Sequence, residues 1–127
     1  GNAKFYVLGR MGRGPKGLER FSKAALAEYV RCFEDPRTVH ASCEDYRASA
    51  TIDLEHDRAD RRRKLKMPVQ VLWGRDGVIE RCFDALADWR EVARDVRGHA
   101  LDCGHFLPEE RPREVLAALG FPDPYSG

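Results

Sequence analysis

The chain has 127 residues, a length that suits a single domain. Hydrophobic residues make up 43% and charged residues 34% of it, an ordinary globular composition that excludes a largely disordered protein. The net charge is +1, so no overall field attracts the chain to nucleic acid or anionic lipid. No apolar run approaches the roughly 20 residues of a membrane span, and no secretory signal pattern is present, so we expect a cytoplasmic protein.

The four cysteines are widely spaced and form no Cys-x-x-Cys pair, which predicts reduced, mostly buried thiols. A zinc site would have to combine His40 and Cys43 with Cys103 and His105. Structural zinc usually takes paired ligands from tight knuckles, so this alternative is the weaker one. We expect no metal and no cofactor.

The first half of the chain predicts two helices after a loop. Residues 9–20 contain four glycines and a proline, which indicates a loop, and no Gly-Lys-Ser/Thr follows that would make it a phosphate-binding loop. Ser22 is a good N-cap for a helix that must end before Asp35-Pro36, where Asp35 caps a second helix. Apolar residues recur at helical spacing in both (Leu26, Tyr29, Val30 and Phe33, then Val39, Cys43, Tyr46 and Ala50). The tight corner predicts a helical hairpin.

A highly charged stretch, residues 53–66, separates the two halves. Its basic end, residues 61–66, could be a nucleic-acid patch. Acidic residues just upstream, the lack of interleaved aromatics and the near-neutral chain favour a solvated linker or helix end instead.

The second half predicts a strand–helix–strand–helix unit. Residues 69–73 form a short apolar run closed by Gly74, and residues 96–101 form a second such run, as in buried parallel strands. The intervening helix is expected to face inward with Phe83, Leu86, Trp89 and either Val92 or Ala93. A last helix with Val115, Leu116 and Leu119 ends at Gly120 and Pro122, and residues 121–127 are predicted to be irregular.

A two-stranded parallel sheet is poorly viable alone, because parallel sheets are normally covered on both faces and flanked by further strands. The unpaired edge of residues 69–73 therefore predicts self-association.

Functional groups of open α/β sheets gather on the loops that leave the C-terminal ends of strands. Two such loops are expected here, residues 74–77 and residues 104–107. His105 lies on the second loop, and the near-neutral pKa of a histidine suits proton transfer. A capping or core histidine is the alternative interpretation.

Several segments resemble one family. These are Met67–Gly74, Cys43–Ala48 (Cys-Glu-Asp-Tyr-Arg-Ala), Thr51–Asp57, Leu86–Arg90 and Gly104–Glu110 (Gly-His-Phe-Leu-Pro-Glu-Glu). Together, from about Phe5 to Leu119, they resemble the haloacetate (fluoroacetate) dehalogenases of the α/β-hydrolase family. The resemblance implies an α/β fold class, specifically a partial α/β-hydrolase fold. Residues 1–66 would be the C-terminal part of the helical cap region, and residues 67–127 the C-terminal βαβα part of the core.

The resemblance also implies a two-step hydrolysis of the carbon–halogen bond of a small haloacid. An Asp carboxylate attacks the carbon and releases halide, and a His then activates water to cleave the ester. By motif match, His105 is that base and Tyr46 stabilises the halide. Without the resemblance, Tyr46 would be taken as a core tyrosine. Asp76 is expected to be a turn residue, because the family takes its acid from an earlier strand.

The sequence contains no Gly-x-nucleophile-x-Gly turn of the kind that carries the nucleophile in this fold. We therefore expect that the chain alone does not dehalogenate haloacetates. The alternative is a non-catalytic hydrolase fragment that acts as a self-associating or interaction module. Neither interpretation involves nucleic acid or membrane as a partner.

Overall fold

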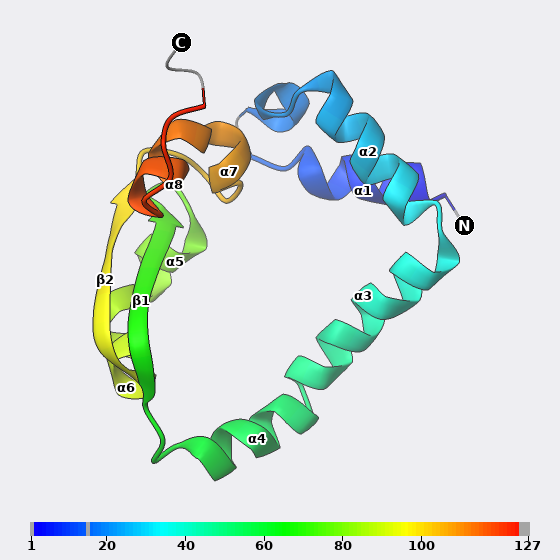
Figure 1. Cartoon of the computed structure of the whole chain (residues 1–127). Helices are drawn as coiled ribbons and strands as arrows, with labels where there is room; N and C mark the ends of the chain where they lie inside the picture. The colour runs from blue at the N-terminus through cyan, green and yellow to red at the C-terminus, as the bar shows by residue number, and fades with distance from the viewer. Residues whose placement is uncertain (1, 15, 125–127) are drawn as a thin grey trace. The chain divides into compact units, whose positions relative to one another are not determined.

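The computed structural model describes residues 2–14 and 16–124 and consists of two compact units, residues 1–60 and 61–127 (Figure 1). The predicted irregular tail is described as far as Pro124, without helix or strand from Phe121 onward. Its last three positions lie outside the described residues. Within the part of the chain that the structure describes, no helix is both long and apolar enough to cross a membrane.

The first unit begins with a helix, α1 (Ala3–Met11), that extends into the predicted loop. The Asn2 carboxamide caps it by accepting a hydrogen bond from the Phe5 N–H at 3.0 Å. A short 3₁₀ turn, η1 (Gly17–Arg20), follows. The loop prediction is therefore wrong for residues 9–11 and 17–20. A glycine inside a helix costs only about 1 kcal/mol relative to alanine, which burial of Val7 on the same helix offsets.

The next two helices begin where the sequence predicts. Helix α2 (Lys23–Phe33) is capped by Ser22, whose hydroxyl accepts a hydrogen bond from the Ala25 N–H at 3.0 Å. Helix α3 (Pro36–Ser49) is capped by Asp35, whose carboxylate accepts from the Arg37 N–H at 2.9 Å. Both caps are confirmed, because a cap depends only on residues within one helical turn.

The predicted hairpin of α2 and α3 is wrong. Helix α2 packs along α1, and α3 leads away from the corner at Asp35 (Figure 1). Aromatic pairs join α1 and η1 to α2: Tyr6 to Phe33, with ring centroids 6.4 Å apart, and Phe21 to Tyr29 at 6.2 Å. Helix α4 (Ile52–Asp60) and residues 61–64 after it are exposed throughout. The solvated linker or helix end predicted for residues 53–66 is therefore confirmed up to residue 64, whereas residues 65 and 66 already belong to a strand.

The second unit is built on two parallel strands, β1 (Leu65–Gly74) and β2 (Ala93–Leu101). Both begin a few residues before the predicted runs. Their register aligns Val69 with Val96 and Gly74 with Leu101. The parallel order of the two predicted strands is thus confirmed.

The segment between the strands is two helices, α5 (Val78–Cys82) and α6 (Ala85–Val92), and not the single predicted one. Phe83 is extended, and the Asp84 carboxylate caps α6 by accepting from the Ala87 N–H at 3.0 Å. This restart changes which side chains face inward. Phe83 and Trp89 are exposed, contrary to the prediction, whereas Leu86 packs against the core as expected. Of the two alternatives Val92 and Ala93, it is Ala93 that is buried.

The core of this unit lies between one face of the sheet and α6. Its buried members are small or branched, and partly buried apolar residues pack around them: Val71, Ala85, Ala93 and Val96, with Val69, Trp73 and Leu86. Beyond β2 come α7 (Leu107–Glu110) and the predicted last helix, α8 (Pro112–Ala118), which ends near Gly120 in the left-handed region at φ 78°.

The four cysteines all lie in the described part of the chain and form no disulfide, as expected. The expectation that most of them are buried is wrong. Cys103 is fully buried at the end of β2, but Cys43 and Cys82 are exposed. Cys43 lies within α3, and Cys82 is the last residue of α5.

Candidate active site

The loops that follow β1 and β2 are tied together by their backbones. The Arg75 N–H donates to the Leu101 carbonyl at 2.9 Å, and the Asp76 N–H donates to the Cys103 carbonyl at 3.1 Å. The hydrogen-bond ladder of the sheet therefore continues beyond the strand ends into both loops. Asp76 sits in a turn closed by the Gly77 N–H on the Gly74 carbonyl, so its interpretation as a turn residue is confirmed.

Gly74 lets these two loops come close. A Cβ atom at this position would lie 1.8 Å from the Gly104 carbonyl oxygen and 2.7 Å from the Cys103 carbonyl oxygen. Only a residue without a side chain fits, because both neighbouring groups are backbone and cannot rotate away. The glycine at the end of β1 thus sets the position of the segment that carries His105.

An ion pair between two side chains also joins these loops. The Arg75 guanidinium lies 2.7 Å from the Asp102 carboxylate. Its hydrogen bond lowers the pKa of the Asp102 carboxyl below the ordinary range, and Asp102 in turn raises the pKa of Arg75. Both groups are exposed, so the pair orients the loops more than it stabilises the fold.

Replacement of Arg75 by glutamine is expected to raise the pKa of Asp102 toward its ordinary value, because the largest cause of its lowering is removed. In the unchanged chain the folded pKa lies below the unfolded one. The pair therefore contributes stability above the unfolded pKa and loses it as the pH falls through the folded pKa. A pH titration of the Asp102 carboxyl carbon by NMR measures the change. Arg97→Gln, which removes a partner of Asp95 instead, should leave the Asp102 titration where it was.

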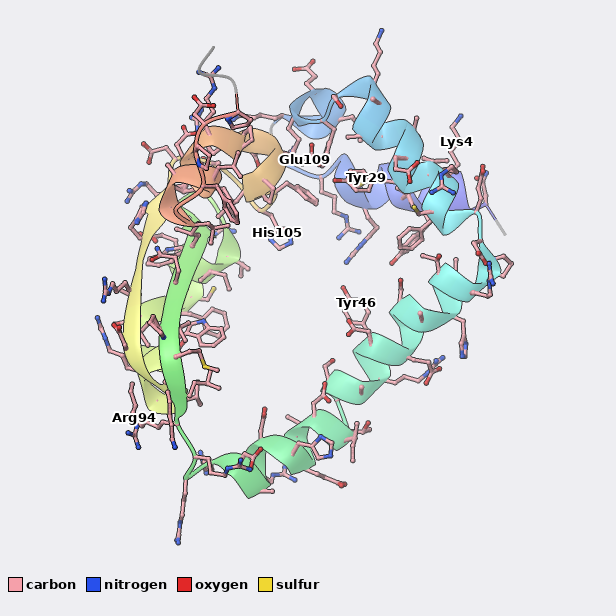
Figure 2. The ribbon with its side chains drawn as sticks, in the orientation of Figure 1. Lys4, Tyr29, Tyr46, Arg94, His105 and Glu109 are labelled. Carbon is pink, nitrogen blue, oxygen red and sulfur yellow. The ribbon has the colours of Figure 1, made fainter. Side chains whose placement is uncertain are left out.

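His105 lies on the loop between β2 and α7, as predicted for a C-terminal strand end, and its side chain is exposed (Figure 2). The Phe106 ring meets it edge-on, with centroids 5.2 Å apart and planes 80° apart. An exposed imidazole on a fixed loop can exchange protons with a bound molecule or with water. Because its ring is exposed, His105 is not a core histidine.

Hydrogen bonds hold the segment on both sides of His105. The Gly104 N–H donates to a Glu110 carboxylate oxygen at 3.2 Å, and the Arg111 guanidinium donates to the Asp102 carbonyl at 3.1 Å. The Phe106 carbonyl accepts from the N–H of Glu110 at 2.9 Å. The backbone around His105 is therefore fixed although its ring is exposed.

Tyr46 belongs to the first unit and projects from α3 on the side that faces α1 (Figure 2). It lines a hollow of about 880 Å³ together with Tyr6, Arg10 and Phe33. Its side chain is 69% exposed, so it is not a packed core tyrosine here. His105 belongs to the other unit.

Sequence reasoning missed the ion pair and the anchoring carboxylate beside His105. Arg75 and Asp102 each follow directly on the aligned pair Gly74 and Leu101, so the strand register places them opposite one another. The register between β1 and β2 would have predicted the ion pair, but it cannot be inferred from the sequence of either strand alone. Among the described residues, no group of three His, Cys, Asp or Glu side chains is arranged to hold a metal ion.

Comparison with known proteins gives relatives of one class. The chain is 33% identical over 115 residues to a fluoroacetate dehalogenase of Burkholderia and 38% identical over 103 residues to a soluble epoxide hydrolase of Corynebacterium. These alignments cover 91% and 80% of this chain but only 38% and 34% of the two relatives. A solved structure from Nostoc, described as an α/β hydrolase, is 52% identical with a TM-score of 0.83 and covers 93% of this chain and 40% of its own. No family model matches the sequence.

The parallel strands, the helices between them and these similarities show that the chain has part of the fold of the α/β-hydrolases. Within that class, its sequence is similar to fluoroacetate dehalogenase and to epoxide hydrolases, which confirms the predicted similarity. The chain spans well under half the length of these relatives, in agreement with the expected C-terminal part of such an enzyme.

Proposed function

We propose that this chain contributes the water-activating part of a haloacetate-hydrolysing α/β-hydrolase. Residues 1–66 would belong to the cap of that enzyme and residues 67–127 to its core. The observation that carries the proposal is the position of His105 on the loop after β2, in a chain similar over 91% of its length to fluoroacetate dehalogenase. The exposed ring and the fixed backbone around it suit a general base.

In the proposed reaction, an Asp carboxylate from outside this sequence attacks the carbon that bears the halogen. A carbon–oxygen bond forms, the carbon–halogen bond breaks and the halide leaves with the electron pair. Tyr46 donates a hydrogen bond to the departing halide, which matters most for fluoride because it is a poor leaving group. His105 then removes a proton from water, which attacks the ester carbonyl, and glycolate and the free carboxylate are formed.

The isolated 127-residue chain is expected to release no fluoride from fluoroacetate, because the sequence has no nucleophile-bearing turn. A fluoride-selective electrode measures this directly, with His105→Ala as the matched variant. Fluoride release by the chain alone that the His105→Ala change abolishes would contradict the proposal.

Epoxide opening is a second candidate, supported by the 38% identity to the soluble epoxide hydrolase. Attack by the same Asp would open the ring, and the ring oxygen would stay on the substrate as an alcohol after it takes up a proton. His105 would serve the same water-activating step. The two candidate functions can be distinguished with an enzyme in which the missing nucleophile has been supplied. Given fluoroacetate and an epoxide in separate assays, a dehalogenase releases fluoride and an epoxide hydrolase forms a diol.

A non-catalytic module that associates with a second copy of itself is the alternative to both. Its supporting observation is β1, whose second edge pairs with no strand in the described part of the chain and whose first half exposes Leu65 and Met67. Unpaired strand edges with exposed apolar side chains favour strand pairing between chains. The net charge of +1 opposes such pairing little.

Light scattering of the purified chain is expected to show a dimer or larger assembly at moderate concentration. The double change Leu65→Lys and Met67→Lys should shift it to monomer, since lysines on an edge strand prevent pairing. Leu54→Lys on the exposed helix α4 is the matched control, because it changes an exposed leucine away from the sheet, and it should leave the assembly intact. A clean monomer for the unchanged chain would contradict self-association.

A further inference from the structure

Glu110 contacts the His105 loop on both sides of the histidine. Its carboxylate accepts a hydrogen bond from the Gly104 N–H at 3.2 Å, and its own N–H donates to the Phe106 carbonyl at 2.9 Å. Gly104 and Phe106 are the immediate neighbours of His105. One residue therefore holds the backbone of both neighbours of the histidine, at the Gly104 N–H and at the Phe106 carbonyl.

The geometry of α7 makes this double contact possible. Leu107–Glu110 form a single helical turn, and both Glu109 and Glu110 donate their N–H groups to the Phe106 carbonyl. The turn brings the end of α7 back over its beginning, so the Glu110 side chain reaches the loop that precedes the helix. The bond is partly buried, where a charged acceptor binds an N–H more strongly than a neutral one does.

The carbonyl group of Gly104 is restricted as well. The Gly104 carbonyl lies against Gly74, where no side chain would fit. Gly104 is thus held by Glu110 at its N–H and confined by β1 at its carbonyl. His105 can change its side-chain angles, but its backbone has little freedom.

We propose that Glu110 is the positioning residue of the His105 loop and acts on the imidazole through the Gly104 N–H. This assignment rests on the proposed role of His105 as the water-activating base. Glu110 does not touch substrate or water in this role. It fixes the direction from which the His105 ring reaches the water, and misplacement of a catalytic group by about 1 Å is sufficient to cost about 100-fold in rate.

Amide and imidazole NMR signals of the full chain test the assignment without any activity. In Glu110→Ala, the Gly104 amide is expected to exchange with solvent about tenfold faster or more and to shift upfield, because a charge-assisted bond is lost. The His105 ring signals should broaden or multiply as the loop samples several positions. Glu109→Gln, which alters the neighbouring carboxylate on the same helical turn, should leave both readouts unchanged.

Glu110→Gln keeps an acceptor oxygen of the same shape and covers the case in which the alanine variant does not fold. It should restore a single set of His105 ring signals while the Gly104 amide still shifts upfield, since a neutral acceptor is weaker. A Gly104 amide that is unchanged in Glu110→Gln, or in a folded Glu110→Ala, would overturn the proposal. These signals report on the loop alone, so they distinguish a wrong positioning role from a wrong catalytic role for His105.

Discussion

Replacement of Gly74 by alanine is expected to destabilise the second unit by about 3 kcal/mol or more, because the new methyl group must displace backbone. A Cβ at residue 74 would lie 1.8 Å from the Gly104 carbonyl oxygen, which is far too close for two atoms that are not bonded to each other. The β1 end and the His105 loop would have to separate. The ladder bond from the Arg75 N–H to Leu101 and the bond from the Asp76 N–H to Cys103 would break with them.

Urea unfolding followed by tryptophan fluorescence measures this loss specifically, since both tryptophans, Trp73 and Trp89, belong to the second unit. Gly9→Ala is the matched control. A Cβ there meets nothing within 4 Å, so alanine should stabilise α1 by up to about 1 kcal/mol. That gain should appear in far-UV circular dichroism and leave the fluorescence transition unchanged. A Gly74→Ala transition within about 0.5 kcal/mol of the unchanged chain would mean that the two loops do not touch.

The second large effect is expected at His105 in a completed enzyme. A hybrid in which residues 5–119 replace the matching segment of the Burkholderia fluoroacetate dehalogenase supplies the nucleophile that this sequence lacks. In that hybrid, His105→Asn is expected to lower steady-state fluoride release by a factor on the order of 1,000, the usual contribution of a general base. The first turnover should survive, because the step proposed for His105 comes after the halide has left.

The matched comparison is Tyr46→Phe in the same hybrid. Loss of a hydrogen bond to the departing halide slows the first step, so the initial burst itself should slow by a factor on the order of 100. The two variants thus separate the two steps of the reaction. Equal effects of both changes on the burst would mean that His105 acts before the ester forms.

Helix starts were predictable where a single side chain closes a local hydrogen bond. Ser22 and Asp35 cap their helices as the sequence indicates, because the partner N–H lies within three residues. The parallel strands were predictable for a similar reason, since a short apolar run bounded by glycine or polar residues suits few other structures. Local chemistry was sufficient in both cases.

Errors arose where a local pattern competed with a second one. The apolar spacing of Phe83 and Trp89 fits one long helix, but the Asp84 carboxylate begins a new helix and leaves both rings exposed. The glycines from residue 9 onward indicate a loop, but the Asn2 cap and the burial of Val7 favour a helix that includes Gly9 and ends at Met11. In both cases the sequence contains a capping residue and a competing apolar or glycine pattern, and the sequence alone does not reveal which of them decides the structure.

In the candidate site, too, one part could be predicted from the sequence and another could not. The position of His105 after a strand could be predicted, because the order of strand, glycine and histidine is local. The contacts that fix it could not, since Gly74 and Arg75 meet the His105 loop only through the register of two strands about 27 residues apart. The carboxylate of Glu110 reaches Gly104 only because α7 turns back on the loop.

The most direct test of His105 as the water-activating base is the intact mass of the His105→Asn hybrid after exposure to fluoroacetate. We expect the protein to gain the mass of one carboxymethyl group, because the ester forms but no base activates the water that would cleave it. A protein of unchanged mass that continues to release fluoride at the rate of the unmodified hybrid would contradict this role for His105.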